Sequence, residues 1–180
     1  FGRFWLALVS VYLISNEAKA THAMGADLTY TCIGNGQYQV QLQFFRDCGG
    51  ISPAGSYSMT YSSATCGVSA SITLTQSGSA TDVTPICASA SSNCGGGGGS
   101  FGIEQWTYTG TLNLPVGCGN DWVLGWSTCC RNNAITTLSN PGNQSFYVYA
   151  NLDNTTALCN SSPVFNNDPT PIVCINQPVS

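Results

Sequence analysis

Few residues in this chain of 180 residues could perform catalytic chemistry. The single histidine, His22, follows a predicted signal-peptide cleavage site by two residues, and side chains beside a chain terminus are usually solvated and mobile. Nucleophilic catalysis by serine or cysteine needs a histidine near the nucleophile, so the sequence shows no such constellation. Asp47 and Glu104 are the carboxylates that could form a glycosidase pair. In the simpler interpretation, Asp47 pairs with Arg46 or caps a turn and Glu104 lies on a solvated strand face, so we expect no enzyme.

The cysteines carry the clearest chemical pattern. An even number of them in so short a chain is typical of a disulfide framework formed in an oxidising compartment. Zinc sites use paired C-x-x-C knuckles, which the sequence lacks. We expect five structural disulfides among Cys32, Cys48, Cys66, Cys87, Cys94, Cys118, Cys129, Cys130, Cys159 and Cys174. Spacing alone does not fix the pairing, and the working hypotheses are Cys66–Cys118, Cys87–Cys94 and Cys159–Cys174.

The adjacent Cys129 and Cys130 are predicted to bond separate partners, because neighbouring side chains on a strand point to opposite faces. A vicinal disulfide between them is the alternative, and it demands a special geometry. A redox-active role has little support, since Arg131 is the only basic neighbour that could favour a thiolate.

Oxygen ligands suited to calcium occur in three loops, at 119–121, 152–154 and 166–168. None of these loops has EF-hand spacing, and Asn and Asp are also ordinary turn residues. We expect no cofactor, while a structural calcium site formed by convergence of these loops in the fold stays open.

Charge is scarce along the whole chain. Charged residues make up 7% of the sequence, against roughly 25% in an average globular domain. Four basic residues cannot form a nucleic-acid footprint, so we exclude DNA and RNA as partners. Arg46 and Arg131 are the only cations after residue 20. Each is expected to make a fixed ion pair with a carboxylate, so Arg46, Asp47 and Arg131 are structural ion-pair candidates. The alternative for Arg131 is that it binds an acidic sugar.

The N-terminus indicates export. Residues 4–14 (FWLALVSVYLI) form an apolar run of signal-peptide length after Arg3, and Ala18 and Ala20 give a small-x-small cleavage pattern. The run is shorter than the roughly 20 residues of a membrane-spanning helix. We therefore predict a signal peptide over 1–20 and a single disulfide-rich β domain over 21–180, located outside the cell or on its surface.

Strand signals follow one another along the mature part. In QYQVQLQFF at 37–45, hydrophobic residues alternate with glutamines, which is the period of a half-buried strand. The residues Gly34 to Gly36 before it form a hairpin-type turn signal. Further strands are expected at 26–33, 56–62, 68–75, 103–114, 121–128, 145–152 and 172–175. The pattern predicts an all-β fold, a disulfide-stapled antiparallel β-sandwich (Ig-like or jelly-roll-like) with long loops.

The tryptophans admit two interpretations. Trp106, Trp122 and Trp126 lie on predicted strands, and Trp122 and Trp126 share a face because they are four residues apart. Buried tryptophans would form the core, which we expect. Exposed tryptophans would instead indicate carbohydrate binding.

Several separated motifs resemble one family. The opening ATHAMGADLTYTCIGNGQYQVQLQFFRDCGG contains a histidine turn, a Tyr-x-Cys strand and Arg46-Asp47-Cys48. CCRNNAI at 129–135, NPGN at 140–143 and CNSSPVFNNDPTPIVCINQPVS at 159–180 follow in the same order as in that family. The chain thus resembles the N-terminal module of gliding-motility-associated, PKD-repeat-containing surface proteins of Bacteroidetes-type bacteria.

The resemblance implies type IX secretion and a longer, adhesin-like chain of which this would be the first module. The function we expect is a non-enzymatic secreted cell-surface module used in surface attachment or gliding motility. A structural subunit of an extracellular fibre is the alternative, because low charge and β-sheet edges permit polymerisation; a glycan-active enzyme using Asp47 and Glu104 has less support. Expected partners are downstream domains of the same chain, surface glycans and other cell-surface proteins. Self-assembly stays open, and we expect no membrane span in the mature part.

Overall fold

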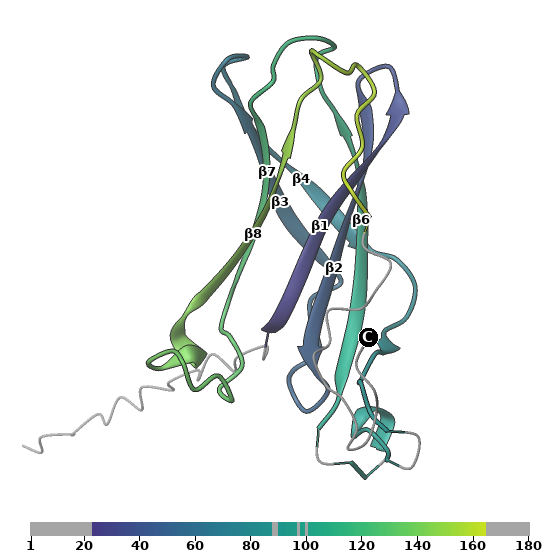
Figure 1. Cartoon of the computed structure of the whole chain (residues 1–180), viewed down its shortest axis with the longest axis vertical. Coiled ribbons are helices and arrows are strands. Elements are labelled where there is room, and N and C mark those ends of the chain that lie inside the picture. The colour runs from purple at the N-terminus through teal and green to yellow at the C-terminus, as the bar shows by residue number, and fades with distance from the viewer. Residues whose placement is uncertain (1–22, 88–89, 97, 100, 165–180) are drawn as a thin grey trace, which may run out of the picture.

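The computed structural model describes residues 23–164 apart from 88–89, 97 and 100 (Figure 1). Within this part the regular structure is strands and two single-turn 3-10 helices, Cys94–Gly96 (η1) and Pro141–Asn143 (η2). The strands are β1 (Ala23–Gly34), β2 (Gln37–Asp47), β3 (Ser56–Ser63), β4 (Val68–Gln76), β5 (Thr81–Asp82), β6 (Ile103–Asn113), β7 (Trp122–Cys129) and β8 (Ser145–Leu152). The strands predicted within the described residues are confirmed with end shifts of a few residues, and β5 is an addition that the sequence did not predict.

Other expectations lie outside the described residues. These are the signal peptide over 1–20, His22, the loop at 166–168, the strand at 172–175 and Cys174.

The strands form one antiparallel sheet that nearly closes on itself. The order of neighbours is β1-β2-β6-β4-β3-β7-β8, and β5 pairs with β6. Figure 1 shows β1, β2 and β6 on one side of the molecule and β7 and β8 on the other, with β3 and β4 crossing obliquely between them. The predicted all-β, disulfide-stapled antiparallel architecture is confirmed, as a sandwich that approaches a barrel.

Chain segments after β7 and β8 complete the closure at β1. Ala23 forms a parallel bridge with Arg131, and the Ala23 N–H donates to Cys130 O at 3.3 Å. Near the other end of β1, the Tyr30 hydroxyl donates to Asn151 O on β8 at 2.8 Å. Ser162 N–H donates to Tyr30 O at 3.0 Å, so the chain after β8 lies along the edge of β1. These contacts occupy backbone groups of β1 near both of its ends.

Alternation along the strands places one face of each in the core. On β2, Tyr38, Val40, Leu42 and Phe44 are fully buried, as the sequence pattern requires. Trp122 and Trp126 are 0% and 2% exposed, which confirms them as core residues. The remaining large buried side chains include Met59, Leu74, Tyr108, Leu112, Leu124 and Leu152. Burial of each large apolar side chain stabilises the fold by about 1.5–3 kcal/mol.

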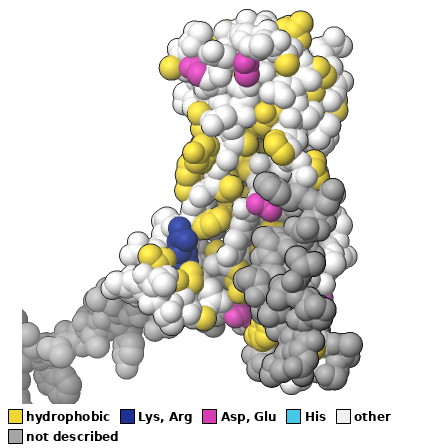
Figure 2. Space-filling model, viewed as in Figure 1, with side chains coloured by type: hydrophobic (Ala, Val, Ile, Leu, Met, Phe, Trp, Pro, Cys, Tyr) yellow, Lys and Arg dark blue, Asp and Glu magenta, His cyan; other side chains and the backbone are white. Residues whose placement is uncertain are grey.

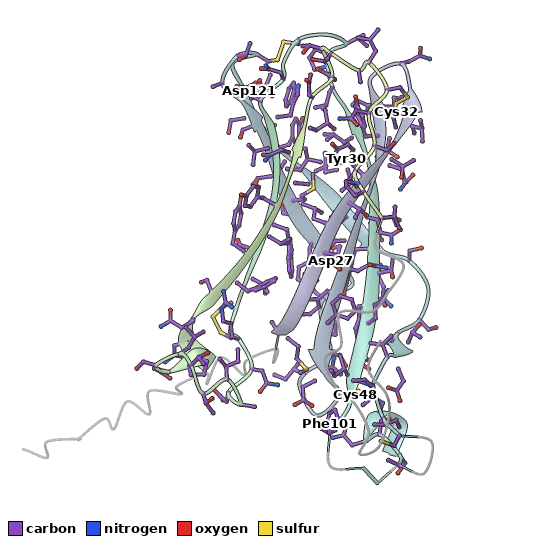
Figure 3. The ribbon with its side chains drawn as sticks, in the orientation of Figure 1. Asp27, Tyr30, Cys32, Cys48, Phe101 and Asp121 are labelled. Carbon is purple, nitrogen blue, oxygen red and sulfur yellow. A yellow bond between two sulfur atoms is a disulfide. The ribbon has the colours of Figure 1, made fainter. Side chains whose placement is uncertain are left out.

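Four disulfides are described: Cys32–Cys159, Cys48–Cys94, Cys66–Cys118 and Cys129–Cys130. Cys66–Cys118 confirms a working hypothesis. The hypotheses Cys87–Cys94 and Cys159–Cys174 are wrong, although Cys87 is disulfide-bonded. Figure 3 shows Cys32 toward one end of the molecule and Cys48 toward the other, so the bridges fasten both ends of the sheet.

Strand contacts explain the two wrong pairs. The segment after β8 runs beside β1, where the Ser161 hydroxyl accepts from Cys32 N–H at 3.0 Å, and this brings Cys159 to Cys32. At the other end, Cys48 N–H donates to Gly102 O at 3.0 Å and Asn93 N–H donates to Phe101 O at 3.0 Å. These bonds bring the loop that carries Cys94 against the end of β2, beside Cys48. Such neighbours are set by the sheet and not by distance along the chain.

The prediction that Cys129 and Cys130 bond separate partners is also wrong, because they bond each other. Strand β7 ends at Cys129, and Cys130 has a φ of 90°. The backbone therefore leaves the extended conformation at Cys130, and the side chains no longer alternate as strand neighbours do.

Candidate functional site

The buried cation Arg46 faces the interior at one end of the sheet. Arg46 on β2 pairs in register with Glu104 on β6, and directly paired residues share a face. The Arg46 Nε donates to Glu104 Oε1, and Trp106 Nε1 donates to the same oxygen at 2.6 Å. Arg46 is 5% exposed and the Glu104 side chain is 15% exposed. The expectation of a solvated Glu104 is therefore wrong, and so is the pairing of Arg46 with Asp47.

Asp47 points to the opposite face from Arg46, as the next residue on a strand does. Its Oδ1 accepts from Gly49 N–H at 2.8 Å, which confirms the turn-capping interpretation. Its Oδ2 accepts from Asn132 Nδ2 at 3.3 Å. Asp47 and Glu104 thus lie on opposite faces of the sheet, and this geometry gives no support to a two-carboxylate glycosidase site.

Residues 129–132 (CCRN) contact residues 46–48 (RDC) and the first residue of β1. Asn132 N–H donates to Ala23 O at 3.1 Å, and Asn132 Oδ1 accepts from Ala134 N–H at 2.8 Å. With its bond to Asp47, the buried Asn132 connects the chain after β7 to the end of β2. The two stretches are therefore brought together by the fold, where they hold one end of the sheet closed.

Arg131 does not form the ion pair expected of it. Among the described residues the one ion pair is Arg46–Glu104. The Arg131 Nε donates to Ser145 O at 3.1 Å, and its guanidinium carbon lies 5.3 Å from the centre of the Phe146 ring. The cation is thus held by a backbone oxygen and an aromatic face.

The calcium-type loops that the structure describes use their carboxylates locally. Hydrogen bonds from the Ser63 hydroxyl and the Thr65 N–H lower the pKa of Asp121. The Thr155 hydroxyl and N–H likewise hold the pKa of Asp153 well below its usual range. Within the described residues no group of three or more His, Cys, Asp or Glu side chains could hold a metal ion.

An exposed aromatic pair lies on the outer face of β8, and the sequence analysis did not single it out. Tyr147 and Tyr149 are 55% and 58% exposed. Their rings are stacked, with centroids 5.9 Å apart and planes 19° from parallel. The sequence does contain a sign of this pair, because Tyr147 and Tyr149 occupy alternate positions of the strand predicted at 145–152. The opposite face of β8, which carries Phe146 and Val148, packs against the core.

A glycine on β7 makes room for this pair. Gly125 is buried and pairs in register with Tyr149. A Cβ atom at Gly125 would lie 3.0 Å from both Cε2 and Cζ of Tyr147. The Tyr147 ring therefore leans across β7 with its hydroxyl end against the backbone at Gly125, while more than half of the residue stays exposed.

Apart from Val123 and Gly125, the other residues of this outer face are polar and uncharged. Cross-strand pairing extends it from β8 across β7 and β3 to β4. Its members are Val123, Gly125, Ser127, Ser58, Thr60, Ser62, Ser69, Ser71, Thr73, Ser145, Tyr147, Tyr149 and Asn151. We call this set the tyrosine face. The face of the molecule in Figure 2 likewise shows few acidic or basic side chains among many uncharged ones.

Comparisons with known proteins do not assign a family. No protein-family model, no curated protein and no solved structure matches the chain. No helix of the described residues is long and apolar enough to cross a membrane.

Proposed function

We propose that this chain is a non-enzymatic, secreted cell-surface module of an adhesin-like protein that serves in surface attachment or gliding motility. The observation that carries the proposal is the exposed Tyr147–Tyr149 pair on an uncharged face of a disulfide-stapled sheet. Exposed aromatic side chains on a rigid scaffold are typical of binding surfaces, because tyrosine offers large contact area at little cost in conformational entropy.

The disulfide framework fits a module exposed outside the cell. Disulfides form and persist in oxidising compartments, and those described here fasten both ends of the sheet. The sequence resemblance to gliding-associated surface proteins supports the same assignment. In that arrangement the module would work beside downstream domains of its own chain and would contact surface glycans or other cell-surface proteins.

The fibre-subunit alternative has less support. Polymerisation through strand pairing needs an open edge. On β1, the Ser162 hydroxyl accepts from Tyr30 N–H at 2.9 Å and Ser162 N–H donates back to Tyr30 O. The chain after β8 thus occupies the hydrogen-bonding edge of β1 at Tyr30 and Cys32, where a second copy could not pair without displacing it.

An attachment assay tests the proposal. Beads coated with the full chain, produced by secretion so that its disulfides form, are settled on polysaccharide-coated glass and on cells of the source organism, and then exposed to flow. We expect them to withstand higher shear than beads coated with the same chain after reduction and alkylation. If both kinds of bead detach at the same shear as protein-free beads on every surface, the chain is not an attachment module.

A genetic measurement tests the location and the role. Deletion of the coding region should reduce attachment or gliding speed, and protease treatment of intact cells should remove the module. A chain that stays protected from protease in intact cells, and whose deletion changes neither behaviour, contradicts the proposal.

A further inference from the structure

We infer that the tyrosine face is a binding site for uncharged oligosaccharide chains, with Tyr147 and Tyr149 as a stacking platform. This inference rests on the proposed function and goes further, because it names the residues and the chemical class of the ligand. It rests on four features of the described residues: the two exposed, nearly parallel rings, the glycine beneath them, the hydrogen-bonding groups beside them, and the charge of the surroundings.

The first feature is that two large rings are left in solvent at neighbouring positions of one strand face. Tyr147 and Tyr149 have more than half of their surface exposed, although the other face of β8 packs on the core. Sugar rings present a face of C–H groups that packs on aromatic rings, while their hydroxyls project from the rim. The two nearly parallel rings, with centroids 5.9 Å apart, form one stacked aromatic pair whose exposed surface consecutive sugar units would contact.

The second feature is the way in which the sheet supports the platform. Glycine inside a strand is unfavourable and often marks a close approach of another group. At Gly125 that group is the Tyr147 ring. The Thr60 hydroxyl donates to Gly125 O at 3.0 Å and ties the backbone beneath the ring to β3. The hydroxyl end of the ring therefore rests against β7 before any ligand arrives, which reduces the entropy cost of binding.

The third feature is the set of hydrogen-bonding groups beside the rings. Ser127 pairs in register with Tyr147, and Asn151 lies two residues after Tyr149 on the same face. Hydroxyl and amide groups both donate and accept, so they match the hydroxyls of a sugar. This combination of aromatic surface with a few uncharged polar groups differs from the apolar centre of a protein–protein interface.

The fourth feature is the charge, and it decides between neutral and acidic ligands. None of the side chains of the tyrosine face is ionised at neutral pH. Arg46 is buried against Glu104, and Arg131 is held by Ser145 O and the ring of Phe146, which belongs to the opposite face of β8. A uronate, sulfate or phosphate would find no cation here to replace its water. The face therefore suits a neutral glycan.

A protein partner fits the same face less well. Stable protein interfaces bury about 1,200–2,000 Å² in total and have an aromatic or aliphatic centre. On the tyrosine face two rings and Val123 are surrounded by serine and threonine. The apolar area of this face is small for a stable protein–protein interface, but it suits contact with one or two sugar rings.

Affinity electrophoresis of the full chain tests the inference. The protein is run under native conditions in gels that contain neutral polysaccharides (β-glucan, mannan, xylan, galactan) or acidic ones (alginate, polygalacturonate). We expect retardation by at least one neutral polysaccharide and none by the acidic ones. Tyr147→Ala with Tyr149→Ala should weaken that binding about tenfold or more, because both stacking surfaces are lost. The double Tyr→Phe variant keeps the rings and should stay within about threefold.

Two further variants separate binding from folding. Gly125→Ala should displace the Tyr147 ring and weaken binding while Tm changes little, since a flexible side chain can move aside. The matched control is Ile33→Ala, which removes an equally exposed side chain (53%) from β1, outside the tyrosine face, and should leave binding unchanged.

The outcomes distinguish this inference from the proposed function. The inference is overturned if no neutral polysaccharide retards the chain, if acidic ones bind more strongly, or if the double variant Tyr147→Ala with Tyr149→Ala binds as well as the unchanged chain. It is also overturned if sedimentation shows a dimer that the double alanine variant abolishes, because the face would then be a contact between copies. If the coated beads still attach in any of these cases, the proposed function stands and its binding site lies elsewhere.

Discussion

Removal of the Glu104 carboxylate should destabilise this protein more than removal of any carboxylate on its surface. Glu104 Oε1 accepts hydrogen bonds from Arg46 Nε and from Trp106 Nε1. In Glu104→Ala the guanidinium of Arg46, which is 5% exposed, keeps its charge and loses its counter-ion. Removing one partner of a buried ion pair costs about 3–5 kcal/mol. Because the Glu104 side chain keeps 15% exposure, we expect a value near 3 kcal/mol, at the lower end of that range.

The double variant Arg46→Met with Glu104→Leu separates the cost of an unpaired charge from the cost of a changed shape. Replacing a buried pair by apolar residues of similar volume is often neutral or stabilising. The double variant should therefore recover most of the loss that comes from the unpaired Arg46 charge. It should lie within about 2 kcal/mol of the unchanged protein, because the Trp106 Nε1 donor still lacks its acceptor. Asp27→Ala is the matched control, because within the described part the Asp27 carboxylate has no hydrogen bond or ion pair; its effect should stay within about 0.5 kcal/mol.

Guanidinium unfolding with the disulfides intact measures these differences. Tryptophan fluorescence reports the transition because Trp122 and Trp126 are buried. Equal m-values across the variants would show that the change lies in stability and not in the unfolded state. A loss below about 1 kcal/mol in Glu104→Ala, or a double variant no more stable than the single one, would refute the claim that Arg46 depends on Glu104.

Three other perturbations have defined outcomes. Trp126→Ala should lower the unfolding free energy by about 3–5 kcal/mol in the same assay, since a 2% exposed ring leaves a cavity; a loss under 1 kcal/mol would contradict its place in the core. Replacing Cys32 and Cys159 by Ser opens a loop of 127 residues and should cost up to about 5 kcal/mol, seen as a lower Tm; an unchanged Tm would show that the bridge does not form. The Ser63 hydroxyl lowers the pKa of Asp121 in the folded protein. The contribution of Asp121 to stability is therefore present above its unfolded pKa of about 3.9 and is lost as the pH falls below that value. Thermal melts between about pH 5 and 2 should show a smaller drop in Tm for Asp121→Asn than for the parent, and an equal drop would contradict this role.

Local patterns in the sequence determined the strands and the composition of the core. The alternation at 37–45 predicts which side of β2 is buried, and the structure confirms it because a strand has a period of two wherever it occurs. The same rule places Trp122 and Trp126 together on one face, and the structure shows that this face is buried. The even number of cysteines indicated a disulfide framework without knowledge of the fold.

Partners across the sheet could not be predicted in this way. Glu104 is 58 residues from Arg46, and the two meet because β6 lies beside β2. Cys159 meets Cys32 across 127 residues because the chain after β8 runs along β1. Strand order and closure depend on how the whole chain buries its apolar faces, and no local spacing encodes that order.

Strand β8 (Ser145–Leu152) shows most clearly what the sequence determines and what the tertiary structure adds. Both of its faces carry large hydrophobic side chains, with Phe146 and Val148 on one and Tyr147 and Tyr149 on the other. The sequence by itself determined that this segment is a strand and that the two pairs are separated, because strand side chains alternate. Only the tertiary structure decided that the tyrosines face solvent, since that depends on which side of β7 closes over the core and on the space that Gly125 leaves for a ring.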